Sequence, residues 1–150
     1  MNFKRKIFKD LERHLSVKQV TVLTGMRRTG KTTLVKQLMQ ITDIEQKLFF
    51  DLEKLEDRDE FDVRNYDLII TKLESKGIDF SKKVMICIDE IQLLPNIPSV
   101  IKYLYDHYDI KFIVDINLLC FINPDDRFQL EAFLTFPIEK LQGSLTQIPH

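Results

Sequence analysis

The sequence predicts an α/β fold in which a mostly parallel sheet is flanked by helices on both faces. Three observations indicate this fold. Short apolar, β-branched segments alternate with segments of helical periodicity through most of the chain. A glycine-containing loop joins the first such strand to the helix that follows it. The chain has 150 residues, of which 44% are hydrophobic, and this suits one domain with a buried core.

The N-terminal segment predicts a helix followed by a buried strand. Ile7, Leu11 and Leu15 recur at four-residue spacing, which predicts a basic amphipathic helix over residues 3–15. Residues 19–24 are mostly β-branched or apolar, so we expect a strand that is buried on both faces of the sheet.

A loop and a second helix follow this strand. Residues 25–30 begin and end with glycine, which predicts a loop. Leu34, Leu38 and Ile41 recur at helical spacing, so residues 31–41 are expected to form a helix.

The middle of the chain predicts a strand, a loop and a helix. Residues 47–52 are expected to form a short second strand. Residues 53–60 are dense in charge and have no hydrophobic period, so we expect a surface loop. A helix is expected over residues 63–75, with Gly77 ending it, because glycine readily adopts the left-handed conformation found at helix C-termini.

Two more strands and one more helix complete the alternation. Residues 83–88 are apolar after Lys83 and predict a third strand, while residues 111–114 predict a fourth. Pro98 suits the first turn of a helix over residues 98–108. Residues 115–150 break this rhythm, and both a helix over 128–134 and a strand over 133–136 stay open there.

Composition excludes several classes of function. The chain has 22 basic and 23 acidic residues and a net charge of −1, which excludes bulk electrostatic attraction to nucleic acids or membranes. Cys87 and Cys120 stand alone in apolar segments, which indicates buried thiols in a reducing compartment, not a zinc site or a disulfide. The longest apolar run is far shorter than the ~20 residues that span a bilayer, so we expect a cytoplasmic protein with no membrane contact.

The segment after the first strand carries the clearest chemical signal. It matches the phosphate-loop pattern G-x-x-x-x-G-K-[ST] and lies between a strand and a helix, as that pattern requires. Glycines allow successive backbone N–H groups to point at phosphate oxygens, and the following helix adds its positive end. The residues predicted to bind nucleotide are Gly25, Met26, Arg27, Arg28, Thr29, Gly30, Lys31, Thr32 and Thr33.

Within this loop, two side chains have expected roles in chemistry. Lys31 is expected to reach the β- and γ-phosphates and to act in catalysis, and Thr32 is expected to offer its hydroxyl to Mg²⁺. No Asn-Lys-x-Asp motif occurs, so guanine selectivity is not indicated and the expected nucleotide is ATP.

A second motif follows the third strand. Asp89 and Glu90 come directly after the apolar run, at the carboxyl end of the strand, where ligands of open α/β sheets bind. Asp89 is therefore a candidate Mg²⁺ ligand, and Glu90 a candidate base for the attacking water. A carboxylate beside the metal-binding acid favours attack by water over phosphoryl transfer to another substrate.

Together these motifs resemble a known family. The segment from Leu23 to Leu34, the block Ile88-Asp89-Glu90-Ile91-Gln92 and Pro95 are similar to the AAA-type ATPase domain of a large prokaryotic group, in which a C-terminal domain of unknown function follows. The resemblance covers residues 3–114. It implies a P-loop NTPase fold whose sheet has an additional strand, ATP and Mg²⁺ as cofactors, and the roles given above for the two motifs.

The chain departs from this family after the fourth strand. Where the family has a small polar segment that senses the γ-phosphate, this chain has Asp115-Ile116-Asn117, and Asn117 is the candidate sensor. Asp115 would repel phosphate if its side chain pointed inward. We therefore expect an incomplete AAA-type domain, truncated or diverged after residue 114, with a core at residues 1–114 and a diverged segment of the same domain at 115–150.

Three functions remain open from the sequence. The first is Mg²⁺-dependent ATP hydrolysis, weak in the isolated chain, because Arg127 is the one arginine beyond Arg64 that could complete the site. The second is a non-catalytic nucleotide-binding module with a protein partner or self-association. The third is a DNA-associated ATPase of the helicase-loader kind, which only the basic first helix supports.

Overall fold

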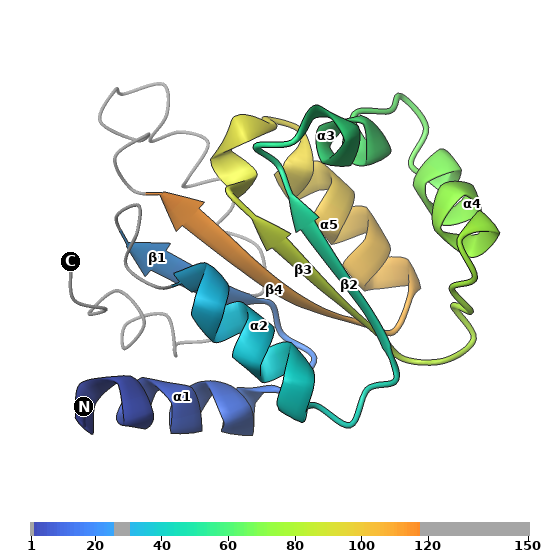
Figure 1. The fold of residues 1–150 in the computed structure, drawn as a ribbon. Coiled ribbons are helices and arrows are strands. Elements are labelled where there is room, and N and C mark those ends of the chain that lie inside the picture. The colour runs from blue at the N-terminus through green and yellow to red at the C-terminus, as the bar shows by residue number, and fades with distance from the viewer. Residues whose placement is uncertain (1, 26–30, 118–150) are drawn as a thin grey trace.

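The computed structural model describes residues 2–25 and 31–117 and forms one four-stranded sheet with helices around it (Figure 1). The strands are β1 (Thr21–Gly25), β2 (Gln46–Asp51), β3 (Val84–Asp89) and β4 (Ile110–Asn117). All neighbouring strands are parallel, and their order across the sheet is β1-β4-β3-β2. β4 therefore lies between β1 and β3. It is the additional strand that the family resemblance implies.

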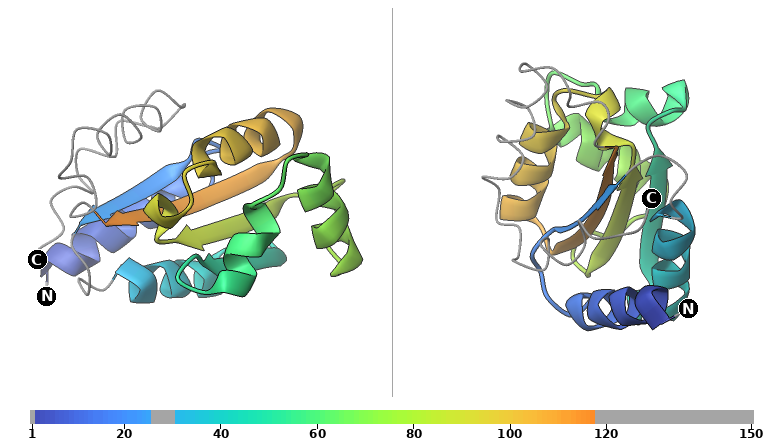
Figure 2. Two further views of the ribbon diagram at one scale, coloured as in Figure 1. Left: turned by 90° about the horizontal axis from the view of Figure 1, so that it is seen from above. Right: turned by 90° about the vertical axis from the view of Figure 1, so that its left-hand side faces the viewer.

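The helices cover both faces of the sheet, as the sequence predicts (Figure 2). They are α1 (Asn2–His14), α2 (Lys31–Ile41), α3 (Leu55–Phe61), α4 (Asp67–Ser75), the 3₁₀ turn η1 (Ile91–Leu93) and α5 (Ile97–His107). α1 and α2 pack on one face, and α3, α4 and α5 contribute to the core on the other.

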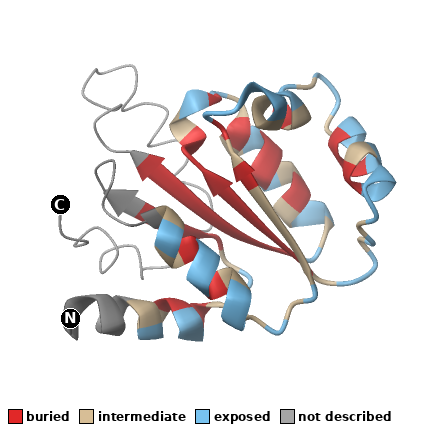
Figure 3. Cartoon of the chain, viewed as in Figure 1, coloured by how far each residue is buried: buried red, intermediate tan, exposed pale blue. Residues whose placement is uncertain are grey.

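Alternate side chains of each strand enter the two cores, because successive residues of a strand point to opposite faces. In β3, Ile86 and Ile88 join the core beneath α5, whereas Met85 and Cys87 join the core beneath α1 and α2. Every residue of β3 is buried, and the exposed residues of the chain lie mainly on the outer sides of the helices and in loops (Figure 3). Pairing with β2 and β4 and burial on both faces restrain β3 as far as its carboxyl end.

The C-terminus of α4 confirms the predicted role of Gly77. This glycine has φ 99°, and its N–H donates to the carbonyl of Glu74 over 2.9 Å. The N–H of Ile78 donates to the carbonyl of Leu73 over 3.2 Å. This pair of bonds is a Schellman motif, which satisfies carbonyls that the end of the helix leaves open.

The helix ending there is shorter than predicted. α4 begins at Asp67, whereas the sequence predicted a helix from residue 63. The side-chain oxygen of Asn65 accepts a hydrogen bond from the N–H of Asp67 over 2.9 Å. Because this bond satisfies a donor in the first turn, the helix can begin at Asp67.

The prediction of a surface loop over residues 53–60 is wrong, because Leu55–Phe61 form helix α3. The segment has one buried apolar anchor, Phe61, which is too few to produce a hydrophobic period. Tertiary contacts hold it instead. Phe61 packs edge-on against Phe50 at 4.8 Å between ring centroids, and Arg58 Nε donates to the carbonyl of Leu52 over 2.5 Å.

The fourth strand is longer than predicted and runs from Ile110 to Asn117. The expected structures over 128–134 and 133–136, together with Cys120 and Arg127, lie outside the described residues, and the division of the domain at residue 114 stays a prediction. Among residues 2–25 and 31–117, no helix has the length and apolar character needed to cross a membrane.

Candidate functional site

The two predicted motifs meet at the carboxyl edge of the sheet. β1 ends at Gly25 and α2 begins at Lys31, while β3 ends at Asp89, and all strands run in the same direction (Figure 1). Across the sheet Gly25 is paired with Asn117, so the start of the phosphate loop lies level with the end of β4. The strand order therefore brings together residues that the sequence separates widely.

A direct hydrogen bond joins the two motifs. The hydroxyl of Thr32, in the first turn of α2, donates to Oδ2 of Asp89 over 2.7 Å. Asp89 is 8% exposed, and the Thr32 side chain is partly buried. The two residues predicted to hold Mg²⁺ are thus adjacent, although 57 positions separate them in the chain.

Three carboxylates gather beside this bond. One oxygen each from Asp89, Glu90 and Asp115 lie within 4.8 Å of one another. Like charges at such separations are costly unless a cation joins them or a proton neutralises one of them. A hydroxyl and carboxylate oxygens are the ligands that Mg²⁺ prefers, so the residues present fit that ion, with Thr32 and Asp89 as the residues that would hold it.

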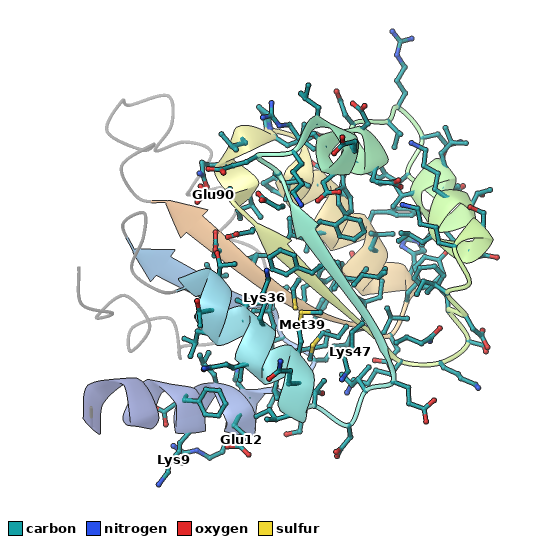
Figure 4. All side chains as sticks on the ribbon, viewed as in Figure 1. Lys9, Glu12, Lys36, Met39, Lys47 and Glu90 are labelled. Carbon is teal, nitrogen blue, oxygen red and sulfur yellow. The ribbon has the colours of Figure 1, made fainter. Side chains whose placement is uncertain are left out.

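Glu90 lies at the end of β3 (Figure 4). Its backbone conformation is unusual. Its φ is 59° and its ψ is 48°, and no other described non-glycine residue has a positive φ. Its N–H donates to Oδ1 of Asp115 over 2.7 Å, and Gln92 Nε2 donates to Oε2 of its carboxylate. A residue other than glycine is strained in the left-handed backbone conformation, and such residues occur often at functional sites.

The structure thus brings Thr32, Asp89 and Glu90 together, as the sequence predicted. Lys31 starts α2 at the same edge of the sheet, and Thr33 is exposed beside it. Gly25 and Asn117 end neighbouring strands there. The predicted loop residues Met26, Arg27, Arg28, Thr29 and Gly30 lie outside the described residues.

Asp115 is the site residue whose place the sequence did not reveal. The sequence predicts that Asp115 would repel phosphate if its side chain pointed inward. The side chain is 2% exposed, and its Oδ1 accepts a hydrogen bond from the backbone N–H of Glu90. Asp115 follows the last residue of the predicted fourth strand, which is a signal for the sheet edge. Only the pairing of β4 with β3 makes Glu90 its partner.

A groove at the other edge of the sheet has a different character. It has a volume of about 800 Å³ and is lined by residues from the end of α1, the segment between α2 and β2, and the residues before β3, among them Glu12, Leu15, Asp43 and Lys82. These segments lie at the amino ends of the strands. The groove therefore has no part in the carboxylate site.

Comparison with known proteins agrees with this arrangement. A family model described as an AAA domain matches residues 17–115. The chain belongs to the AAA domain family. The matched residues of this AAA domain include the phosphate loop, β3 with Asp89 and Glu90, and β4 as far as Asp115. The predicted family and the predicted P-loop NTPase fold are confirmed.

Solved structures share this fold at low sequence identity. Cdc6p from Pyrobaculum aerophilum is 18% identical, with a TM-score of 0.53, over 90% of this chain and 44% of that one. The Walker-type ATPase of Pyrococcus abyssi is 17% identical, with a TM-score of 0.51, over 96% and 50%. PCH-2 of C. elegans is 17% identical, with a TM-score of 0.50, over 85% and 38%.

The AAA domain described here spans half or less of the length of these proteins. No curated protein matches its sequence.

Proposed function

We propose that this AAA domain binds ATP with Mg²⁺ and slowly hydrolyses it to ADP and inorganic phosphate in the cytoplasm. The observation that carries the proposal is the 2.7 Å hydrogen bond between Thr32 and Asp89, with Glu90 next to it. This contact places the hydroxyl of the phosphate-loop helix against the acid of β3, which is the arrangement that an Mg²⁺-nucleotide site needs. Membership of the AAA domain family supports the same reaction class.

Each residue has a defined task in this proposal. Lys31 and the backbone of the phosphate loop bind the β- and γ-phosphates, while Thr32 and Asp89 hold Mg²⁺. The ion neutralises charge on the phosphates when bound. Glu90 orients a water molecule and accepts its proton as the water oxygen bonds to the γ-phosphorus and the bond to ADP breaks. The products are ADP and inorganic phosphate.

The proposal includes slow turnover because the sequence departs from the family at the predicted sensor segment and has only Arg127 beyond Arg64 to complete the site. The predicted γ-phosphate sensor segment begins with Asp115, whose Oδ1 accepts the N–H of Glu90. An arginine that stabilises the transition state contributes about 10³–10⁵ in rate, and a loss of about 10³ corresponds to roughly 4 kcal/mol of barrier. Nucleotide affinity depends on contacts upstream of this segment, so it should be affected much less.

A non-catalytic nucleotide-binding module is the second candidate, and the state of Glu90 favours it. Both its N–H and its carboxylate already have partners, Asp115 and Gln92. Gln92 competes with a water molecule at Oε2 of the Glu90 carboxylate, so a water to be activated would bind the other oxygen, Oε1. Under this alternative the domain would bind ATP and a protein partner, or another copy of itself, without turnover.

A nucleotide titration combined with a phosphate-release assay on the purified chain separates these candidates. Measurable ATP affinity with slow, Mg²⁺-dependent phosphate release supports the proposal. Affinity without any release above background supports the binding module. DNA binding that weakens steeply with salt would instead support the hypothesis of a DNA-associated ATPase of the helicase-loader kind.

Two substitutions assign the roles of the acids. Glu90→Gln keeps the shape of the side chain but removes the base, so we expect ATP and Mg²⁺ affinity to persist while phosphate release falls about 100-fold or more. Asp89→Asn should instead weaken Mg²⁺-dependent ATP binding. If the two variants exchanged these effects, the assigned roles would have to be exchanged as well.

A further inference from the structure

The backbone of Glu90 needs support that its own residue type does not provide. A φ of 59° is unfavourable for any L-residue with a Cβ atom, and residues other than glycine, asparagine and aspartate adopt it rarely. Glu90 lies between β3 and the 3₁₀ turn η1, whose first residue follows it directly. Such a conformation persists only where the surroundings hold it.

Asp115 supplies that support from the neighbouring strand. Its Oδ1 accepts the N–H of Glu90 over 2.7 Å, and its side chain is 2% exposed. A bond from a backbone N–H to a buried carboxylate is charge-assisted and stronger than a neutral one. β4 is fixed beside β3 by parallel pairing up to Val114, so the carboxylate of Asp115 is presented from a rigid element.

A second contact fixes the other end of Glu90. Gln92, in η1, donates to the carboxylate that Asp115 does not touch. Asp115 therefore sets the backbone and Gln92 sets the carboxylate. Between them the position of the Glu90 side chain, relative to Asp89 and Thr32, is defined at both ends.

We propose that Asp115 is a positioning residue that holds Glu90 in its left-handed conformation and so aims the Glu90 carboxylate at the water that attacks ATP. The inference rests on the proposed function for the role of Glu90, but the contact itself does not depend on ATP. Asp115 thus orients the base, Glu90, through the Glu90 backbone and does not sense the γ-phosphate.

Amide hydrogen exchange of Glu90, measured by NMR on the whole chain without nucleotide, tests the contact directly. We expect the Glu90 N–H to be protected in the wild type and to exchange about 10-fold faster or more in Asp115→Ala. Asp115→Asn keeps an oxygen that can accept the bond, so it should restore much of the protection. Asp109→Ala removes an exposed acid just before β4 and serves as the matched control.

Phosphate release provides the second readout. Asp115→Ala should lower the release rate while ATP and Mg²⁺ affinities stay near those of the wild type, and Asp115→Asn should recover at least part of that rate. Adding Glu90→Gln to Asp115→Ala should cause little further loss, because both changes disable the same group.

A glycine substitution covers the case in which Asp115→Ala folds poorly. Glycine adopts a φ of 59° without strain, so Glu90→Gly should raise the melting temperature more in the Asp115→Ala background than in the wild type. An equal effect in both backgrounds overturns the inference.

Two other results also overturn it. One is the same Glu90 exchange rate in Asp115→Ala and the wild type. The other is a loss of Mg²⁺ affinity in Asp115→Asn as large as that in Asp89→Asn, which would make Asp115 a metal ligand. If the exchange pattern holds but the wild type neither binds nor hydrolyses ATP, the proposed function fails while the Asp115–Glu90 contact stands.

Discussion

The strand β4 buries a cation near its beginning and an anion near its end, and the chain satisfies these two groups in different ways. Lys111 is 0% exposed and Asp115 is 2% exposed. They lie on the same face of the strand, because both positions are odd and side chains alternate with a period of two. Lys111 forms hydrogen bonds within the protein core, whereas Asp115 lies in the candidate site.

Lys111 is held by oxygen and nitrogen acceptors at the junction between α1 and β1. Its Nζ donates to the carbonyl of Gln19 over 2.6 Å and to the Thr21 hydroxyl over 3.0 Å, and it lies 3.4 Å from Nδ1 of His14. An ammonium has three donors and no acceptor, so Nδ1 of His14 is the accepting nitrogen. The carbonyl of Gln19 and the hydroxyl of Thr21 are neutral partners from within the chain.

At the other end of β4, Asp115 lies among acids. One oxygen each from Asp89, Glu90 and Asp115 lie within 4.8 Å, and the site is completed in our proposal by Mg²⁺, Lys31 and nucleotide. A buried charge whose hydrogen-bonding groups are satisfied within the chain needs no ligand, whereas a cluster of buried charges of one sign favours a ligand of the other sign. The predictions below test this division, beginning with the largest expected effect.

The largest effect is expected from Lys111→Ala. It removes a buried side chain and leaves the carbonyl of Gln19 and the hydroxyl of Thr21 with fewer partners, so the free energy of unfolding should fall by about 3 kcal/mol. Chemical denaturation measures it. Lys102→Ala is the matched control, because its side chain is 65% exposed and its pair with Asp106 should contribute little.

Two further measurements sharpen this prediction. Lys111→Met keeps most of the buried volume, so its smaller loss isolates the hydrogen bonds. ATP affinity of folded Lys111→Ala should equal that of the wild type, and a lost affinity with unchanged stability would contradict the division between the two ends of β4.

The second effect is stabilisation by ligand. Mg²⁺-ATP at about 100 times its dissociation constant should raise the free energy of unfolding by about 2.7 kcal/mol, because it binds only the folded state. At the same ligand concentration, Asp89→Asn should show a clearly smaller increment and Lys111→Met the full one. An equal increment in Asp89→Asn would remove the acid cluster from the ligand site.

The third effect concerns Lys31, which begins α2 at the carboxyl edge of the sheet. Lys31→Ala should weaken ATP binding by about 2 kcal/mol, or roughly 30-fold, because a charge-assisted contact to phosphate is lost. Isothermal calorimetry measures the affinity. Lys36→Ala removes the same charge from the exposed side of α2 and should leave affinity nearly unchanged (Figure 4). Equal losses of ATP affinity in the two variants would contradict the assignment of the phosphate loop.

The smallest effect is expected at Cys87, which lies between the two ends of the sheet in β3. Burial raises the pKa of the Cys87 thiol from 9.0 to about 12, and the nearby charge of Lys111 offsets this only in part. A raised thiol pKa contributes stability below pH 9 that is lost as the pH rises from about 9 to 12, because the unfolded thiol ionises first.

At pH 10 this loss should be about 1.4 kcal/mol relative to neutral pH. The measurement is the difference in unfolding free energy between the wild type and Cys87→Ala at pH 7 and at pH 10, which cancels other groups that titrate in this range. A difference that does not shrink at pH 10 would contradict the burial of a neutral thiol.

Sequence reasoning recovered the parts of the fold that depend on local pattern. The helix at Lys31–Ile41 agrees with its predicted bounds, and Gly77 ends α4 through a left-handed turn, as expected. It failed at α3, where charged residues and a single buried Phe61 carry no period. Such a short helix is defined by what it packs against, which a local pattern does not contain.

The phosphate loop, the Asp89-Glu90 pair and the alternation of strands with helices could be predicted from the sequence, because each is a contiguous pattern or a local period. Which of these residues meet depends on the tertiary fold. Insertion of β4 between β1 and β3 puts Asp115 against the backbone of Glu90, and packing of α2 puts Thr32 against Asp89. Both contacts depend on the lateral order of strands, and residues far apart in the chain carry no local signal of that order.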